Sequence, residues 1–303
     1  MASLIGLFGL AYRVPAPRLC AAATAPRWFC PLTEFSLDEP RPAADTLPLL
    51  LVLPGLDGSG ITAFTQYPEL SLEYELKVLT IAADDRSSFA SLVELVASEI
   101  AIAGDRPCFV MGESLGCSVA LAAARKAAPS GLVLVSPATG WDRTALGSRL
   151  AQLLSLPDWL LGLIIGISTY QILDTAQFTT SARRIVTGER PPLLDTDARI
   201  AYTYNVVGQM ASRLALPPST IRHRLEAWAA PSIAAGRSVA DVAVPMLVVA
   251  GTADLRVPAV EEAERFAAEA GAAVHLVEGA GHAGVTDDRL DLRRVMRSWR
   301  DAG

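Results

Sequence analysis

Short apolar runs, each bounded by turn-forming residues, recur along most of the chain. Most are rich in Val, Ile or Leu, and each has the length of a β-strand. They are Leu49–Leu53, Lys77–Ile81, Cys108–Met111, Leu132–Val135, Met246–Ala250 and Val274–Val277. Strands that are apolar along their whole length are typical of a parallel sheet that is buried on both faces.

Amphipathic stretches separate these runs. In Phe89–Ile102, for example, apolar residues recur at helical spacing and form one stripe. The other helical stretches are Leu115–Ala128, Val260–Ala270 and Leu290–Trp299. The alternation of strand and helix predicts an α/β fold with a mostly parallel sheet flanked by helices.

The alternation stops between about residues 140 and 244, where prolines interrupt helical and irregular patterns. We therefore expect an α/β core of residues 34–140 and 241–303, with residues 141–240 inserted as a helical lid or cap. The apolar stretch 146–168 would suit a lid over an acyl-binding cleft, or contact with a lipid surface. Packing of the same residues on the sheet is an equally open alternative.

Composition supports a large folded core and narrows the classes of partner. The chain has 303 residues, of which 51% are hydrophobic and 19% charged, with a net charge of −6 and no basic run. This balance argues against a nucleic-acid partner. The mean hydropathy of +0.34 is high. The longest uninterrupted apolar runs, Leu4–Tyr12 and Trp159–Ile167, nevertheless fall well short of the roughly 20 residues of a membrane-spanning helix.

The N-terminal residues 1–33 carry Arg13, Arg18 and Arg27 but no Asp or Glu. An acidic-poor, Arg-bearing N-terminus predicts a cleaved targeting segment, with an apolar N-terminal arm as the alternative. Elsewhere, the spacing of the four cysteines fits neither a disulfide framework nor a metal site, and the three histidines are isolated. We therefore predict no metal and no cofactor.

The candidate nucleophile lies in the segment Gly-Glu-Ser-Leu-Gly at residues 112–116. This G-x-S-x-G pentapeptide directly follows a predicted strand and opens the helix that begins at Leu115, which is the setting of a nucleophile elbow. The turn is so sharp that a Cβ at Gly112 or Gly116 would collide with the neighbouring strand or helix. We expect Ser114 to have a strained backbone and to project its hydroxyl above the sheet.

A serine nucleophile needs a base to take its proton, and the chain offers three histidines. His282 lies in a glycine-rich loop just past the last strand, at the edge of the sheet where active sites gather. His223 is expected on a solvated face, and His275 lies within a strand. Asp254 follows the preceding strand, so the order Ser114, Asp254, His282 is that of an α/β-hydrolase triad. An N-cap of the next helix is the alternative role for Asp254.

The loop Pro54–Gly60, after the first predicted strand, is the candidate source of an oxyanion-hole donor. A tetrahedral intermediate needs two preorganised N–H groups. We expect these to be the N–H of Leu115, directly after the nucleophile, and that of Leu56, with Gly55 allowing close approach of the backbone. The loop lacks the spacing of a Walker or dinucleotide-binding motif, which argues against a phosphate ligand.

Together these motifs resemble the α/β-hydrolase domain of the plant phytyl ester synthases, a plastid family of esterase-, lipase- and thioesterase-like proteins. The matching segments are Leu53–Gly60, Asp85–Phe89 with Leu92-Val93, Gly112–Gly116, Ser136–Thr139 and Gly281-His282. The resemblance implies an α/β-hydrolase fold and the movement of fatty acyl groups onto phytol or diacylglycerol in plastids. Cys117 stands where the family usually has glycine. The chain also ends soon after His282, so we expect the family's C-terminal acyltransferase module to be lacking.

We predict a serine hydrolase that cleaves carboxylic esters, of lipids in particular, with Ser114 as nucleophile, His282 as base and Asp254 orienting that base. Two alternatives remain open: transfer of the acyl group to phytol or another alcohol, and a protein of the same fold that binds without turnover. The expected partner is a small-molecule or lipid ester, with peripheral contact to a lipid surface as a further option. The oligomeric state is not predicted. The plastid is the predicted location, and the cytoplasm and secretion are the alternatives.

Overall fold

One sheet forms the centre of the molecule. The computed structural model describes residues 25–35, 47–144, 147–164, 175–189, 195–214, 216–287 and 289–302. Their strands are β1 (Arg27–Phe29), β2 (Leu49–Leu53), β3 (Glu75–Thr80), β4 (Cys108–Glu113), β5 (Gly131–Val135), β6 (Met246–Gly251) and β7 (Ala273–Val277). The strand order is β1-β3-β2-β4-β5-β6-β7, and every neighbouring pair is parallel except β1 with β3. Each of the six predicted strands overlaps one of β2 to β7.

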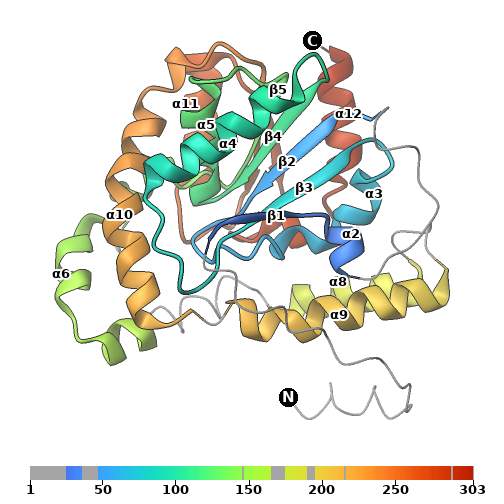
Figure 1. The fold of residues 1–303 in the computed structure, drawn as a ribbon, viewed down its shortest axis with the longest axis horizontal. Coiled ribbons are helices and arrows are strands. Elements are labelled where there is room, and N and C mark those ends of the chain that lie inside the picture. The colour runs from blue at the N-terminus through green and yellow to red at the C-terminus, as the bar shows by residue number, and fades with distance from the viewer. Residues whose placement is uncertain are drawn as a thin grey trace.

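Helices cover both faces of this sheet (Figure 1). In β2, Leu49, Leu51 and Leu53 face one layer, whereas Leu50 and Val52 face the other, because side chains alternate along a strand. The first layer contains α4 (Phe89–Ala103), α5 (Leu115–Ala124), α10 (Pro218–Arg237) and α11 (Ala259–Ala270). The second contains α2 (Pro31–Glu34), α3 (Tyr67–Leu70), α8 (Thr175–Thr187), α9 (Thr196–Leu214) and α12 (Leu292–Ala302). The strands β2, β4, β5 and β6 are therefore buried on both faces, as their apolar runs predicted. For the edge strand β7 the prediction is wrong, because Val274 and Leu276 are 40% and 46% exposed.

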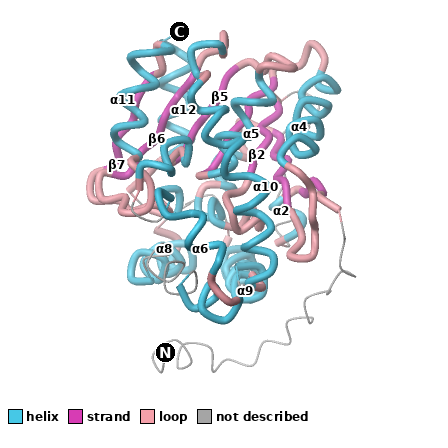
Figure 2. The backbone as a smooth tube through the Cα atoms, turned by 90° about the vertical axis from the view of Figure 1, so that its left-hand side faces the viewer, coloured by secondary structure: helices cyan, strands magenta, loops and turns pink. Residues whose placement is uncertain are grey.

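The parallel strands bring several loops to one edge of the sheet. Leu53 at the end of β2 is aligned with Gly112 of β4, and Glu113 at the end of β4 with Val135 of β5. Beyond β5, β6 and β7 run in the same direction. The loops after β2, β4, β6 and β7 thus leave the sheet side by side. Helices α8 and α9 and α6 (Leu150–Ser155) lie at this end of the molecule, away from the C-terminus (Figure 2).

The described part of residues 141–240 contains helices and turns but no strand. Besides the helices already named, the connection from β5 to β6 includes η4 (Ala138–Arg143), η5 (Gly147–Arg149), a helical segment at 158–164 and η6 (Val239–Asp241). Within the apolar stretch, Leu153 and Leu161 pack against α10, whereas Trp159 and Leu163 are 70% and 54% exposed. Residues 146 and 165–168 of that stretch lie outside the described residues. Among the helices that are described, none is long and apolar enough to cross a membrane.

The N-terminal boundary predicted at residue 33 needs correction. β1 pairs with β3, with Arg27 opposite Thr80, and Leu32 and Phe35 are fully buried. These residues belong to the folded core, which therefore begins before Glu34. The remainder of the predicted targeting segment, residues 1–24, lies outside the described residues.

Candidate active site

Ser114 lies in the turn between β4 and α5. Its φ of 52° is positive, a conformation that costs free energy for a residue with a Cβ. Two glycines allow the turn to close. A Cβ on Gly112 would lie 2.6 Å from the Cys117 nitrogen, and one on Gly116 would lie 2.6 Å from the Leu53 carbonyl oxygen. The serine thus occupies the strained strand-to-helix turn that the pentapeptide predicted.

His282 connects Ser114 with Asp254. Its Nε2 lies 3.0 Å from Ser114 Oγ, and its Nδ1 lies 2.8 Å from Asp254 Oδ2. The three residues come from the loops after β7, β4 and β6, respectively. The Asp254 side chain is 1% exposed and that of His282 11%, while Ser114 is partly exposed. In such an arrangement the imidazole can take the serine proton, and the carboxylate stabilises the imidazolium that results.

Backbone donors hold the Asp254 carboxylate in place. Its Oδ1 accepts from the N–H of Arg256 at 2.7 Å and of Val257 at 3.2 Å, which leaves Oδ2 for His282. The N-cap position of α11 is occupied by Pro258. The alternative role of Asp254 as a helix N-cap is therefore not what the structure shows.

The loop after β2 lies against the elbow. A Cβ on Gly55 would be 3.3 Å from the Ser114 Cβ. The Gly58 N–H donates to the Gly55 carbonyl at 3.1 Å, which closes a β-turn with Leu56 in its second position. Within the described residues, no hydrogen bond joins the N–H of Leu56 or of Leu115 to a protein acceptor. Both N–H groups are therefore available to an oxygen atom of a ligand.

Glu113 is buried directly before the serine. It is 7% exposed, and one oxygen accepts from the Thr62 hydroxyl. Within the described ranges, Oε1 has no hydrogen-bond partner. Burial raises the pKa of Glu113 to about 8, the hydrogen bond from Thr62 opposes that rise, and the charge of Asp57 adds to it. The carboxyl group is therefore mostly neutral at pH 7.

Cys117, where the resembled family usually has glycine, is fully buried. Its Sγ donates to the carbonyl oxygens of Gly112 at 3.1 Å and Val135 at 3.4 Å. Burial raises the pKa of the thiol well above its ordinary value. Because the thiolate is the reactive form, the environment of Cys117 is that of a packed, unreactive cysteine.

For the other two histidines, the structure agrees with the predicted position of His275 but not with that of His223. His223, expected on a solvated face, is half-buried, and its Nε2 is shielded from water with no hydrogen-bond partner among the residues that the structure describes. The next residue, Arg224, is fully buried. His275 lies in β7 as expected, and burial lowers its pKa. In the part of the chain that the structure describes, no three His, Cys, Asp or Glu side chains form a group that could hold a metal ion.

A stripe of donors on α10 was missed in the sequence. Thr220, Arg224 and Trp228 recur every four residues, so they lie on one face of the helix. Their acceptors follow β3: the carbonyl oxygens of Ala83 for Thr220, of Ile81 and Ala82 for Arg224, and of Ser87 for Trp228. The regular spacing of polar or amphipathic side chains was the available signal, but it does not identify the acceptors. The stripe attaches α10 to the loop after β3, beside the candidate site.

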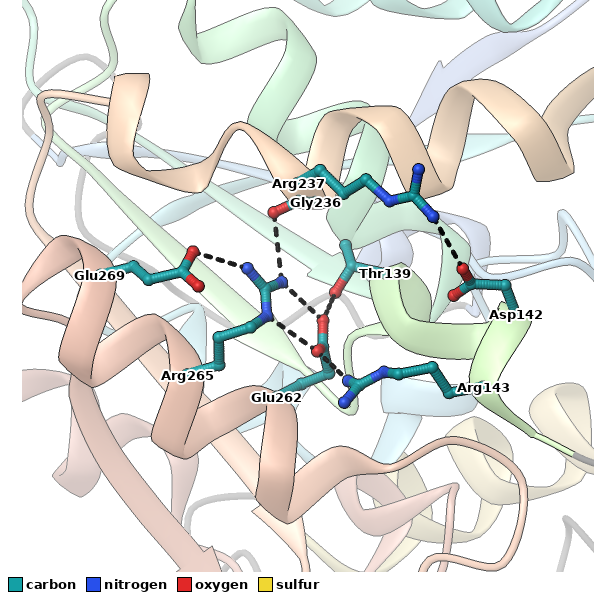
Figure 3. Close-up of polar contacts among 8 residues, drawn as sticks. All are labelled: Thr139, Asp142, Arg143, Gly236, Arg237, Glu262, Arg265 and Glu269. Carbon is teal, nitrogen blue, oxygen red and sulfur yellow. Dashed lines mark hydrogen bonds and ion pairs between the residues drawn. The ribbon is translucent and has the colours of Figure 1, made fainter.

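A second polar cluster, which we call the root cluster, is centred on the buried Glu262 and joins the two ends of the connection from β5 to β6 (Figure 3). It consists of Thr139, Arg143, Gly236, Glu262 and Arg265. Glu262 on α11 is 1% exposed and accepts from Thr139, Arg143 and Arg265. Arg265 also donates to the Gly236 carbonyl at 3.1 Å. Both ends of the connection from β5 to β6 are therefore tied to α11.

A small apolar cavity lies between α4, α5 and α10 and reaches Gly55 and Leu115. Phe89 and Trp228 contribute to its wall, together with Ser232, whose buried hydroxyl has no hydrogen-bond partner in the part of the chain that the structure describes. Its volume of ≈ 10 Å³ is enough for roughly one water molecule. An acyl chain would therefore enter it only if the surrounding helices moved.

Comparison with known proteins identifies the fold. Residues 83–289 match the family model described as "Serine aminopeptidase, S33". An esterase from Rhodococcus sp. ECU1013 has a similar structure, with a TM-score of 0.56 and 17% sequence identity over 86% of this chain and 93% of that one. The α/β-hydrolase fold predicted from the sequence is thereby confirmed.

Two curated proteins of Arabidopsis thaliana are similar in sequence. Phytyl ester synthase 1, chloroplastic, is 28% identical over 303 aligned residues, covering 91% of this chain and 40% of that protein. Phytyl ester synthase 2, chloroplastic, is 36% identical over 141 residues, covering 45% of this chain and 19% of that protein. The chain thus spans less than half the length of either relative, and the predicted resemblance is confirmed.

Proposed function

The chain belongs to the serine aminopeptidase S33 family and is a serine hydrolase, and from this premise we propose that it cleaves carboxylic esters through an acyl-enzyme on Ser114. The observation that carries the proposal is the hydrogen-bonded line from Asp254 through His282 to Ser114. A serine hydroxyl is a weak nucleophile alone, and this line supplies both a base and a group that orients the base.

In the proposed first step, Ser114 Oγ attacks the ester carbonyl carbon while His282 Nε2 takes the hydroxyl proton. Asp254 accepts from Nδ1–H and stabilises the charged imidazole. The negative charge that develops on the substrate oxygen is held by the N–H groups of Leu56 and Leu115. Support for this role is the contact of the Gly55 loop with the elbow and the free state of both donors.

In the second step, the tetrahedral intermediate collapses and the bond to the alcohol oxygen breaks. His282 returns its proton to that oxygen, so the alcohol leaves neutral and the acyl group remains on Ser114. Water, deprotonated by His282, then attacks the acyl-enzyme and releases the carboxylic acid. The proposed nucleophile, base and orienting carboxylate lie in the loops after β4, β7 and β6, and the proposed oxyanion donor Leu56 lies in the loop after β2.

The acyl group is proposed to be that of a lipid. The apolar residues of the segment 150–164 and the names of the two relatives support this choice. We further propose that residues 141–240 act as a cap over the site. The exposed Trp159 and Leu163 would then contact a lipid surface.

Acyl transfer is the second candidate, because both relatives are named phytyl ester synthases. The acyl-enzyme would be the same, and an alcohol such as phytol would replace water as the second acceptor. Since both relatives are named chloroplastic, we also propose a plastid location, with residues 1–24 as the targeting segment.

Product analysis tests the proposal. The wild type and Ser114→Ala would be incubated with acyl esters of increasing chain length, with and without phytol. We expect free fatty acid from the wild type alone, with a preference for medium or long chains. Phytyl ester formed by the wild type alone would favour acyl transfer. Equal ester cleavage by both proteins would overturn the role of Ser114.

A further inference from the structure

Arg224 on α10 is a cation buried among backbone carbonyls. Its side chain is 0% exposed, and among the described residues no carboxylate forms an ion pair with it. Burial lowers the pKa of Arg224 to about 10, while the charges of Asp57 and Asp85 act in the opposite direction. The guanidinium therefore stays charged at neutral pH. Taking such a charge out of water costs several kcal/mol unless hydrogen bonds offset it.

The hydrogen bonds of the guanidinium connect two loops of the core. Nη1 donates to the Leu56 carbonyl at 2.7 Å, and Nη2 donates to the carbonyls of Ile81 and Ala82 at 2.9 Å each. The N–H of Ile81 in turn donates to the Gly58 carbonyl at 2.7 Å. The turn that contains Leu56 is thus held directly by Arg224 and indirectly through Ile81.

The turn has the shape needed to receive the guanidinium. Gly58 has a φ of +69°, and a Cβ there would lie 2.6 Å from Arg224 Nη1. On the helix side, the guanidinium carbon lies 5.2 Å from the centre of the Trp228 ring, a cation–π contact that favours one orientation of the planar group. Both the loop and the helix therefore restrict where Arg224 can be.

We propose that Arg224 is a positioning residue of the oxyanion hole, which orients the Leu56 N–H by holding the Leu56 carbonyl. The inference rests on the proposed function, in which that N–H is one of two oxyanion donors. The carbonyl and the N–H of Leu56 belong to consecutive rigid peptide planes that share one Cα, so fixing one plane restricts the other. The positive charge also lies beside the loop at which negative charge develops, where a low dielectric extends its effect.

The proposal has a consequence for the inserted helix. Arg224 belongs to α10, yet its contacts are with the loops after β2 and β3. A shift of α10 would therefore loosen an oxyanion donor, and α10 must stay docked while the acyl-enzyme forms. Any opening of the insertion would have to come from its other helices.

The test compares Arg224→Gln with Arg222→Gln. Arg222 is two residues earlier on the same helix and also donates to backbone carbonyls, those of Leu154 and Leu156, and to Asp158. Its contacts lie within the insertion, so it is a matched control. The readouts are the melting temperature, kcat and KM for a soluble ester, and inhibition by an alkyl trifluoromethyl ketone, which forms a tetrahedral oxyanionic adduct with an active-site serine.

We expect Arg224→Gln to lower kcat about 100-fold, in line with the loss of one oxyanion donor. Inhibition by the ketone should weaken by a similar factor, while KM stays within about threefold, because the lost interaction acts on the tetrahedral state. Arg222→Gln should change kcat, KM and inhibition by the ketone each by less than about threefold. Equal losses in both variants, or a change in KM alone, would overturn the proposal.

A second variant keeps the test decisive if Arg224→Gln does not fold. Arg224→Lys retains the charge but cannot span the same three carbonyls, so we expect an intermediate loss of kcat and of ketone inhibition. Full activity and full inhibition in the Lys variant would contradict a positioning role. Failure of the proposed function itself has a different signature, namely a wild type that the ketone does not inhibit and an esterase activity that survives Ser114→Ala.

Discussion

Two buried polar clusters join distant parts of this chain, and they are built differently. Around His282 the hydrogen bonds run in one line from Asp254 to Ser114, and the serine end remains partly exposed. In the root cluster, Glu262 accepts from a threonine and two arginines, so both of its oxygens are occupied. The first arrangement leaves a reactive group free on a strained turn, whereas the second leaves no acceptor free. The comparison indicates that activity and stability can be lost separately.

The largest expected effect is on the catalytic side. His282→Ala removes the proposed base, so kcat/KM for an ester should fall by about 10⁴-fold. The melting temperature should change little, because among the described residues the hydrogen bonds of the ring are those with Asp254 and Ser114. His275→Ala on β7 is the control and should keep nearly full activity. If both variants lost activity equally, the assignment of the base would be wrong.

The root cluster should show the reverse behaviour. Glu262→Gln leaves Arg143 and Arg265 without their shared carboxylate. Both arginines are partly exposed and can be rehydrated, so we expect a loss of about 2 kcal/mol in the free energy of unfolding, measured with urea. The folded fraction should keep its kcat within about threefold. Glu269→Gln, which breaks only the surface pair with Arg265, should cost less than about 1 kcal/mol. A kcat that fell while stability held would remove the distinction between the clusters.

Glu113 is a buried glutamate that belongs to neither cluster and lies beside the nucleophile. Among the described residues, its hydrogen-bond donor is the Thr62 hydroxyl. Its pKa is raised by burial from the ordinary 4.5 to about 8, so the folded state binds a proton that the unfolded state releases. This contribution to stability is full below about pH 4.5 and is lost as pH rises to about 8. Between pH 5 and pH 7 the loss amounts to at most about 2.7 kcal/mol.

Glu113→Gln keeps an uncharged group of similar shape at that position. We expect its unfolding free energy to fall less than that of the wild type between pH 5 and pH 7, with urea titrations at both values as the measurement. Activity at pH 7 should stay close to wild type, because Glu113 is already mostly neutral there. Parallel pH profiles for the two proteins would show that Glu113 does not carry this pH dependence.

The smallest expected effect is on ester cleavage at a lipid surface, and it concerns the exposed face of residues 158–164. Trp159→Ser combined with Leu163→Ser removes two exposed apolar side chains. Cleavage of a soluble ester should be unchanged, whereas cleavage of the same ester in lipid vesicles should fall several-fold because less apolar surface enters the interface. Ile102→Ser, 75% exposed on α4, is the control. An equal loss in the control would rule out a specific lipid-contacting face.

The sheet and the candidate triad were accessible from sequence for one physical reason. β2, β4 and β6 are buried along their whole length, so an uninterrupted apolar run is required at each, and parallel strands bring their final loops to one edge. Residue types suited to acyl transfer then identify Ser114 after β4 and Asp254 after β6, and His282 is found in the same way after the apolar run of β7, which is less buried. β1 was missed because a three-residue edge strand gains its stability from pairing with β3, which no local pattern records.

The buried charges could not be predicted in the same way. An arginine is usually exposed, and Arg224 is buried only because the carbonyls of Leu56, Ile81 and Ala82 meet it from two other loops. Glu262 lies in a helix whose charges resemble those of a solvated face. Leu56, which accepts from Arg224, and Thr139, which donates to Glu262, are each more than 100 residues away from their partner in the chain. Periodicity indicates which face of a helix a residue shares, but not what that face contacts.

The most direct test of the central claim is a fluorophosphonate reaction with the folded wild type, followed by mass spectrometric mapping of the adduct. The account predicts one covalent adduct on Ser114, formed much more slowly in His282→Ala and absent in Ser114→Ala. An adduct on a different serine, or a folded wild type that does not react, would contradict the account.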